Sequence, residues 1–348
     1  MKFSARRVLS LSGGATLVIA LGALTACGGG TDEGAQPEEA ATAAATIQAS
    51  ARHAAPYKRV GITAIVASPD GKSVAVAHSD GRVSLLDAVN RTETRQLTGQ
   101  GDRVAAGLVF TSEGRYLVSV DRDSVVRVWN VETGATALTL RGHEHPLRSV
   151  SASADGTAIA TAGDDTRVML WNGSTGQLKR VLRGATDFVN SVSVSPDGQW
   201  VASGDANSRV LVWNAATGNV VASLGAHSGE VNAVAFSPDG HTLASAGEDG
   251  KVVIWQIGAG QGSATLEGSG PSVLSLAFSN DGQTLAAGGA DGKVRLWDLA
   301  SRKVLSESAT SAAAVNALAF GVRNRSELLY GDGHSGVLAV TVSRQAAQ

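Results

Sequence analysis

The sequence predicts an all-β fold, a seven-bladed β-propeller of four-stranded antiparallel blades. Three observations predict it: a turn tetrapeptide that recurs about every 42 residues, a tryptophan with the same period, and short alternating apolar runs between them. The turns begin at Ser68, Thr111, Ser153, Ser195, Ser237 and Ser279, with Gly321 at the seventh place. The tryptophans are Trp129, Trp171, Trp213, Trp255 and Trp297, with Leu86 at the first place. A fixed period of this length indicates a repeat architecture.

Each repeat unit carries the pattern of four short strands. In the unit 231–267, apolar alternation predicts strands at 231–236, 242–246, 251–256 and, more weakly, 263–266. The Ser-Pro-Asp-Gly turn has Pro where φ must be preset and Asp and Gly where the chain reverses. A single twisted sheet of this size cannot bury both faces, so neighbouring units must stack, and radial closure protects their edges. The repeat cores are expected at 58–100, 101–142, 143–184, 185–226, 227–268, 269–310 and 311–348.

Over about 290 residues the chain resembles the WD-repeat family. Trp297-Asp298 matches the dipeptide that names the family, Trp129-Asn130, Trp171-Asn172 and Trp213-Asn214 are close to it, and Gly142-His143 matches the pair that opens a blade. The resemblance implies hydrogen-bonded structural tetrads of His, Ser or Thr, Asp and Trp. By position these are His143, Thr161, Asp165 and Trp171, and His227, Ser245, Asp249 and Trp255. Other units keep only part of the tetrad, so we expect them to depend more on packing.

The resemblance also implies how the ring closes. The last unit ends near 342–343, which leaves too few residues for a fourth strand. The family lends an N-terminal strand to the last blade, and 45–54 lies where that strand should be, with His53 as a candidate opening histidine. Exposed strand edges invite aggregation, which favours such pairing. The alternative is an unpaired edge and a longer N-terminal tether.

The first 26 residues have the three parts of a secretory signal peptide. Lys2, Arg6 and Arg7 precede an apolar stretch and a run of small residues. Leu24-Thr25-Ala26-Cys27 resembles the lipobox of bacterial lipoproteins, which implies cleavage before Cys27 and its acylation. An uncut membrane anchor is the alternative, but the apolar stretch is shorter than the roughly 20 residues that span a bilayer. Residues 27–45 are rich in Ala, Gly and acidic side chains, as expected for a flexible tether to the domain at 46–348.

Composition argues against several other functions. The formal charge is −2, so no basic excess exists to bind nucleic acid. No cofactor motif is present, and His78, His145, His241 and His334 lack metal-ligand spacing. The Ser, His and Asp of the tetrads recur with a tryptophan, whereas a catalytic triad converges once in a cleft. We therefore expect no enzyme activity, no metal and no cofactor.

The turns between the second and third strands and the loops between blades carry a candidate partner face. Its charged residues, with Phe188 as a candidate apolar anchor, are Asp102, Arg122, Glu144, Arg148, Asp164, Asp187, Asp205, Glu230 and Glu248. Such charges either are solvated surface or steer a basic partner. Asn190, Asn232 and Asn316 recur after a Val, where strand-edge hydrogen bonding is the favoured role.

Together these features predict a monomeric, non-catalytic scaffold for protein assembly or sensing, lipid-anchored to the bacterial cell envelope on the periplasmic face or cell surface. One alternative is a propeller hydrolase or lactonase with a site at the mouth of the central channel. Another is an accessory lipoprotein of an outer-membrane assembly machine. The sequence alone does not identify the partner.

Overall fold

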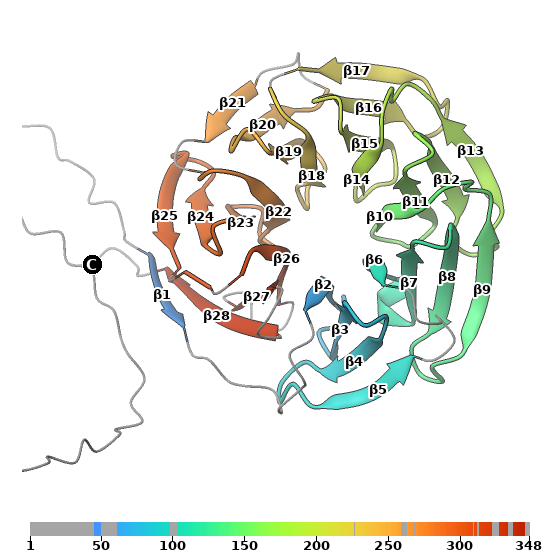
Figure 1. The fold of residues 1–348 in the computed structure, drawn as a ribbon, viewed down its shortest axis with the longest axis horizontal. Coiled ribbons are helices and arrows are strands. Elements are labelled where there is room, and N and C mark those ends of the chain that lie inside the picture. Colours follow the sequence, from blue (N-terminus) through green and yellow to red (C-terminus); the bar gives the residue numbers. More distant parts are fainter. Residues whose placement is uncertain are drawn as a thin grey trace, which may run out of the picture.

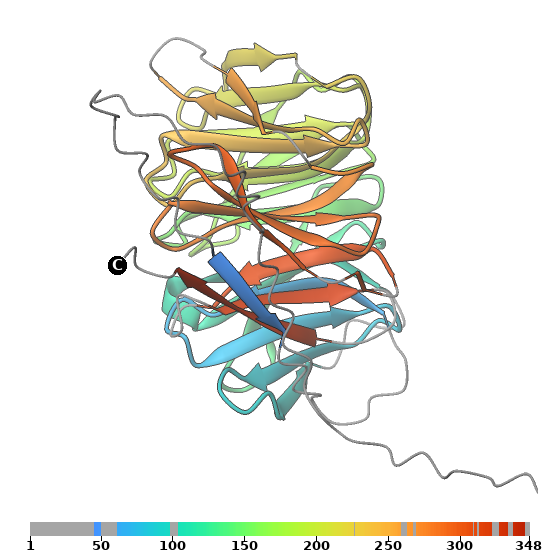
Figure 2. The same cartoon turned by 90° about the vertical axis from the view of Figure 1, so that its left-hand side faces the viewer.

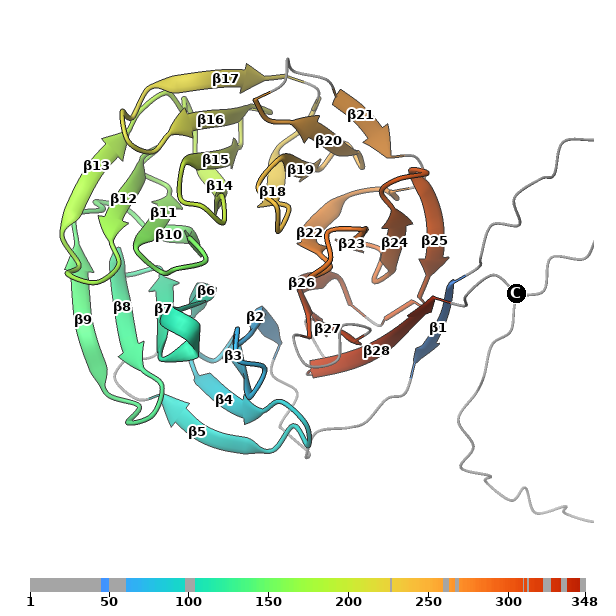
Figure 3. The same cartoon turned by 180° about the vertical axis from the view of Figure 1, so that it is seen from behind.

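The computed structural model describes residues 45–49, 61–97, 104–225, 227–258, 263–266, 269–308, 310–311, 313–321, 327–332 and 337–344. Apart from one short 3-10 turn, η1 (Ser112–Gly114), the regular elements in these residues are strands. They form a closed ring of antiparallel sheets around a central axis, with β2, β6, β10, β14, β18, β22 and β26 innermost (Figure 1). The same ring is seen from behind in Figure 3.

Six blades are each built from four consecutive strands. Blade 1 contains β2 (Ile62–Ala67), β3 (Ser73–His78), β4 (Val83–Asp87) and β5 (Glu93–Leu97), and blade 2 contains β6 (Ala105–Thr111), β7 (Tyr116–Asp121), β8 (Val125–Asn130) and β9 (Thr136–Arg141). Blade 3 contains β10 (Leu147–Ala152), β11 (Ala158–Gly163), β12 (Val168–Asn172) and β13 (Leu178–Leu182), and blade 4 contains β14 (Val189–Val194), β15 (Trp200–Asp205), β16 (Val210–Asn214) and β17 (Val220–Leu224). Blade 5 contains β18 (Val231–Phe236), β19 (Thr242–Gly247), β20 (Val252–Gln256) and β21 (Ser263–Leu266), and blade 6 contains β22 (Val273–Phe278), β23 (Thr284–Gly289), β24 (Val294–Asp298) and β25 (Lys303–Glu307).

The blade count predicted from the repeats needs a correction. In the described residues, six continuous repeat units each supply all four strands of a blade. The C-terminal unit supplies three strands, β26 (Val315–Phe320), β27 (Glu327–Asp332) and β28 (Val337–Arg344). Their sheet is completed by β1 (Ala45–Ala49), which pairs antiparallel with β28 from Ala45↔Arg344 to Ala49↔Val340 (Figures 1 and 2). Counting complete repeat units therefore gives six blades, whereas counting four-stranded sheets gives seven. Of the candidate closing segment, residues 50–54 with His53 lie outside the described residues.

The repeated turn tetrapeptide holds its own geometry. In blade 4, Ser195 Oγ donates to Asp197 Oδ1 at 2.6 Å, and Ser195 Oγ accepts a hydrogen bond from the Trp200 amide at 2.9 Å. Gly198 has φ of 71°, a left-handed conformation that glycine adopts without steric cost. In this turn the Ser and Asp side chains form hydrogen bonds that hold the reversal, and the Gly adopts the left-handed conformation that it requires, which explains why the turn sequence recurs.

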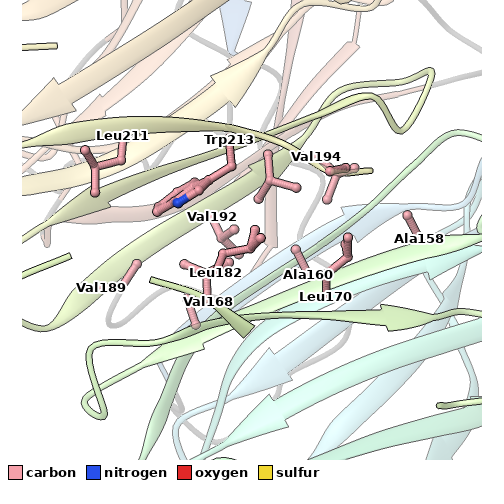
Figure 4. Close-up of a cluster of buried hydrophobic side chains, with 13 residues drawn as sticks. Ala158, Ala160, Val168, Leu170, Leu182, Val189, Val192, Val194, Leu211 and Trp213 are labelled. Carbon is pink, nitrogen blue, oxygen red and sulfur yellow. The ribbon is translucent and has the colours of Figure 1, made fainter. Parts of the chain in front are cut away.

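Apolar side chains fill the space between neighbouring blades. Figure 4 shows one such cluster, in which Leu170 and Leu182 of blade 3 meet Val192, Leu211 and Trp213 of blade 4. Burying these side chains stabilises the fold by roughly 25 cal/mol for each Å² of apolar surface that is removed from water. The core is consequently a ring of separate inter-blade layers, and each layer depends on side chains from two repeats.

Polar side chains near the axis add hydrogen bonds between consecutive blades from blade 3 to blade 6. Ser149 Oγ accepts from the Val192 amide and Ser191 Oγ accepts from the Val234 amide, both at 3.0 Å. Asn232 Nδ2 donates to the Val273 carbonyl at 3.0 Å. These inner strands would otherwise leave backbone groups unpaired at the blade edge.

Residues 1–44, which contain the predicted signal peptide, Cys27 and nearly all of the tether, lie outside the described part of the chain. Among the residues that are described, no helix has the length and apolar character needed to cross a membrane.

Candidate functional site

The first structural tetrad connects the loop before blade 3 with the interior of that blade. His143 Nδ1 lies 2.7 Å from Asp165 Oδ2, and His143 Nε2 lies 2.8 Å from Thr161 Oγ1. Trp171 Nε1 donates to the same Thr161 oxygen at 2.8 Å. A carboxylate oxygen only accepts, so Nδ1 donates to Asp165, and the Thr161 hydroxyl joins the imidazole to the indole.

The second tetrad repeats this arrangement in blade 5. His227 Nδ1 lies 3.0 Å from Asp249 Oδ1, His227 Nε2 lies 2.8 Å from Ser245 Oγ, and Trp255 Nε1 donates to Ser245 Oγ at 2.9 Å. Burial raises the pKa of Asp249, but the hydrogen bond from His227 and those from the Ser228 and Lys251 amides together outweigh it, so the pKa of this carboxyl is lowered. The pKa of Asp165 is lowered in the same way, by His143 and two backbone amides acting together against burial.

The tetrads are built for structure. The side chains of His143 and Asp165 are 0% and 2% exposed, so a substrate has no access to the imidazole. Thr161 is 0% exposed, and its hydroxyl lies between the Trp171 indole and the His143 imidazole, so a substrate does not reach it either. These sets resemble a triad in composition only.

In both blades with a tetrad the second strand ends at a glycine that lies close against the incoming loop. A Cβ on Gly247 would lie 3.0 Å from His227 Nδ1, and one on Gly163 would lie 2.2 Å from the Pro146 carbonyl oxygen. In blades 2 and 4, where the opening histidine is absent, the equivalent positions are Asp121 and Asp205. The two blades with an opening histidine thus have glycine at this strand end, and blades 2 and 4 have aspartate there.

Blades 2 and 6 use an arginine where the histidine is missing. Arg127 contacts Asp121 and donates to Asp123 Oδ2 at 2.7 Å. Burial and a hydrogen bond with Asp123 raise the pKa of Asp121 to about 7. Arg295 contacts Asp291 and Glu307 at 2.6 and 2.8 Å in blade 6.

The sequence interpretation missed these two networks, although their signal was present. An arginine stands two residues before Trp129 and two before Trp297, whereas the corresponding positions before the other three repeat tryptophans are Met169, Leu211 and Val253. A basic residue at that position, together with the absent opening histidine, indicates the alternative network.

Blade 4 holds its loop in a third way. Trp213 Nε1 donates to the Arg183 carbonyl at 3.1 Å, and the Ala206 amide donates to the Phe188 carbonyl at 2.9 Å. Asn207 Nδ2 donates to Thr186 Oγ1 at 3.1 Å. Loop 183–188 therefore lies over blade 4 through backbone contacts.

Several residues of the candidate partner face lie on the loops and turns of blades 3, 4 and 5. Those that contact one another are grouped around Arg148. The Arg148 guanidinium contacts Asp164, donates to Asn190 Oδ1 at 3.1 Å and lies 5.1 Å from the centre of the Phe188 ring. Asn190 Nδ2 in turn donates to Glu230 Oε2 at 3.2 Å. We call Arg148, Asp164, Phe188, Asn190 and Glu230 the Arg148 cluster. Phe188 is 43% exposed, which is high for a phenylalanine held by a charged neighbour.

Other predicted face residues lie around this cluster. Glu248 is exposed, and its amide donates to the Glu230 carbonyl at 2.9 Å, which joins their two loops. Asp187 Oδ1 accepts from the Phe188 amide at 2.8 Å. Glu144 pairs with Arg167, a residue that the sequence interpretation did not include, at 2.8 Å.

Two predicted face residues lie apart from the cluster, and a third falls outside the described part of the chain. Asp205 is only 1% exposed, and its Oδ1 accepts from the amides of Asn207 and Arg209, so it supports a turn and offers no surface. Arg122 is exposed in the turn of blade 2. Asp102 lies outside the described residues.

Within the described ranges, no group of three or more His, Cys, Asp or Glu side chains is arranged to hold a metal ion.

Comparison with known proteins gives a family. The model of the WD domain, G-beta repeat, matches residues 91–130, 134–172, 176–214, 218–256 and 260–298, together more than half of the chain. Each matched segment runs from the outer strand of one blade to the third strand of the next. The sequence repeat is therefore offset by one strand from the structural blade, which is the offset that lets β1 complete the last sheet.

Relatives with similar sequences match over short stretches. U3 small nucleolar RNA-associated protein 21 of Saccharomyces cerevisiae is 38% identical over 73 residues, 21% of this chain and 8% of that protein. Meiotic recombination protein rec14 of Schizosaccharomyces pombe is 30% identical over 93 residues, 27% of this chain and 30% of that protein. An uncharacterized WD repeat-containing protein of Synechocystis is 33% identical over 98 residues, 28% of each chain.

The matched stretches span less than a third of each of these relatives, so the individual activities of the relatives are not transferred to this chain. What the repeats share is the fold, and proteins built from them typically act as non-enzymatic scaffolds that bind other proteins. The propeller architecture, the two buried tetrads and the five matched repeats lead to one conclusion: this chain is a member of the WD-repeat family.

Proposed function

We propose that this protein is a non-catalytic scaffold that binds a protein partner through the face over blades 3 to 5, with the Arg148 cluster at its centre. The observation that carries the proposal is the exposed Phe188 ring beside the Arg148 guanidinium. Arginine and aromatic side chains supply a disproportionate share of binding energy in protein interfaces. Both are held in place before a partner arrives, which reduces the entropy lost on binding.

The charges around the cluster favour a partner with a basic segment. Arg148 is already engaged by Asp164. Among the described residues, no Lys or Arg forms an ion pair with Asp187, Glu230 or Glu248. These carboxylates give the loops at and beside the cluster a net negative charge, which would steer a positively charged partner and disfavour an acidic one.

The test is crosslinking of the native protein in its own membranes, followed by mass spectrometry, with wild type beside Phe188→Ala. Val89→Ala is the matched control, because Val89 is also an exposed apolar side chain, 68% exposed, but lies in a turn on the opposite face. We expect one protein to be captured by wild type and by Val89→Ala and to be lost from Phe188→Ala. Equal capture by all three, or no specific capture, would contradict the proposal.

We further propose that the scaffold is tethered to the bacterial cell envelope by acylation of Cys27. The support is the lipobox-like Leu24-Thr25-Ala26-Cys27 after a signal-peptide pattern. Several acyl chains together anchor a protein far more firmly than one. Cys27→Ser should abolish incorporation of labelled fatty acid and move the protein from the membrane to the soluble fraction. Retention of the label or of membrane association in this variant would exclude this tether.

A further inference from the structure

The outer strand of blade 4, β17, is an unusually open edge. It is the last strand of its sheet and lies at the rim of the ring (Figure 1). Its sequence, Val-Val-Ala-Ser-Leu, contains no charged residue, and Val220 and Val221 are 45% and 47% exposed. An uncharged, apolar edge strand is a template for pairing with another strand.

Most other outer strands carry the charges that prevent such pairing. The outer strands of blades 1, 2, 3 and 6 each contain at least one charged side chain: Glu93 and Arg95, Arg141, Lys179 and Arg180, and Lys303 and Glu307. Counted from the residue that pairs with the repeat tryptophan of each blade, Lys179 in blade 3 stands at the same position as Val221 in blade 4. Two other outer strands are also uncharged: β21 of blade 5 has only four residues, and β1 of the composite sheet lies beside β25 of blade 6. Blade 4 therefore lacks a protection that its neighbour has at the same position.

We propose that two copies of this protein pair through β17, antiparallel and around a two-fold axis at Ala222. In this register Val220 lies opposite Leu224 of the second copy, and Val221 lies opposite Ser223. β17 is self-complementary because it brings no charged residue against the second copy. The same pairing of β13 would place Lys179 and Arg180 near the Lys179 and Arg180 side chains of the second copy. The shared surface of one strand pair is small, so the dimer forms reversibly with concentration.

This pairing replaces the sequence-based expectation of a monomer, and it does not depend on the partner proposed for the Arg148 cluster, which lies on loops of the blade face. The two surfaces are separate, so a partner bound to one face leaves β17 accessible. A dimer would then present two copies of the Arg148 cluster on one assembly, which raises avidity for a multivalent partner.

Sedimentation velocity of the full mature chain over a range of concentrations tests the pairing. Val221→Lys introduces the charge that blade 3 has naturally, and Ala137→Lys on β9 is the matched control at the same repeat position in blade 2. We expect wild type and Ala137→Lys to shift toward dimer with concentration and Val221→Lys to stay monomeric. A wild type that is monomeric throughout, or a dimer that persists in Val221→Lys, would overturn the proposal.

A crosslink tests the register. Opposed residues of antiparallel strands have Cα atoms about 4.5–5.5 Å apart, within the range that a disulfide spans. Under a mild oxidant, Ala222→Cys should give a product of twice the chain mass, whereas Ala137→Cys should not. Circular dichroism checks that both variants fold. A product that contains a different protein, or the same yield from both variants, would contradict pairing between copies through β17.

Discussion

The imidazole Nδ1 of His143 lies 2.7 Å from Oδ2 of Asp165, a residue twenty-two positions later in the chain. His143 belongs to the loop that enters blade 3, and Asp165 belongs to the turn between β11 and β12. This buried contact attaches the incoming loop to its own blade. Because Arg148 lies a few residues after His143, the tetrad also sets where the candidate partner face begins.

Loss of this imidazole should destabilise blade 3. His143→Ala would leave Asp165 Oδ2 and the Thr161 hydroxyl buried without their partner, at a cost of about 2–4 kcal/mol. The measurement is the midpoint of urea unfolding followed by tryptophan fluorescence. His241→Ala, which alters an exposed histidine, should change stability by less than about 0.5 kcal/mol. Equal losses in the two variants would show that the tetrad adds no stability.

The opening histidine and the residue at the end of the second strand should be energetically coupled. Ala185 stands in blade 4 where His143 stands in blade 3, and the second strand of blade 4 ends at Asp205 where both blades with a tetrad have glycine. Ala185→His alone should therefore destabilise the protein, and Ala185→His with Asp205→Gly should recover at least about 1 kcal/mol beyond additivity. A double-mutant cycle from urea unfolding measures this. Strict additivity would mean that the two positions do not compete for space.

Acidification should destabilise blade 1 through His78. Burial, and then the nearby Arg82, lower the pKa of His78 below its ordinary value of 6.5. The unfolded chain therefore binds this proton more readily than the folded one, so its contribution to stability is present above pH 6.5 and declines as pH falls below it. His78→Gln cannot titrate and should lose less stability than wild type between pH 7.5 and pH 5. Parallel stability curves for the two proteins would contradict this account.

The boundary between blade 1 and the composite sheet should depend on one ion pair. Arg91 contacts Glu327 at 2.6 Å, and the two side chains are only 11% and 23% exposed. Glu327→Ala would leave the guanidinium partly buried without its carboxylate, which should cost about 1–3 kcal/mol. Thermal unfolding measures the loss, with Lys72→Ala as the control because the Lys72–Asp70 pair is well exposed. An equal effect of the two substitutions would argue against a role for the ion pair at this boundary.

Several features follow from the sequence alone, and the reasons are local. The turn tetrapeptides encode their own conformation through Ser195 Oγ, Asp197 and a left-handed Gly198, so their spacing locates the strands. The two tetrads could be placed because His, Ser or Thr, Asp and Trp recur at the same intervals, and the hydrogen bonds between them join those residues. The last repeat lacks a fourth strand, which favoured pairing with an N-terminal strand over an unpaired edge, and β1 pairs with β28.

Tertiary structure decided the rest, because it depends on contacts between repeats that no single repeat encodes. It distinguished six self-contained blades from one composite sheet, since only pairing with β28 determines where β1 lies. It buried Asp205 while leaving Phe188 exposed, although both were assigned to one face. It also brought Arg148, Asn190 and Glu230 together from three blades. Local conformation repeats with the sequence period, whereas the contacts between blades depend on which side chains two different repeats present to each other.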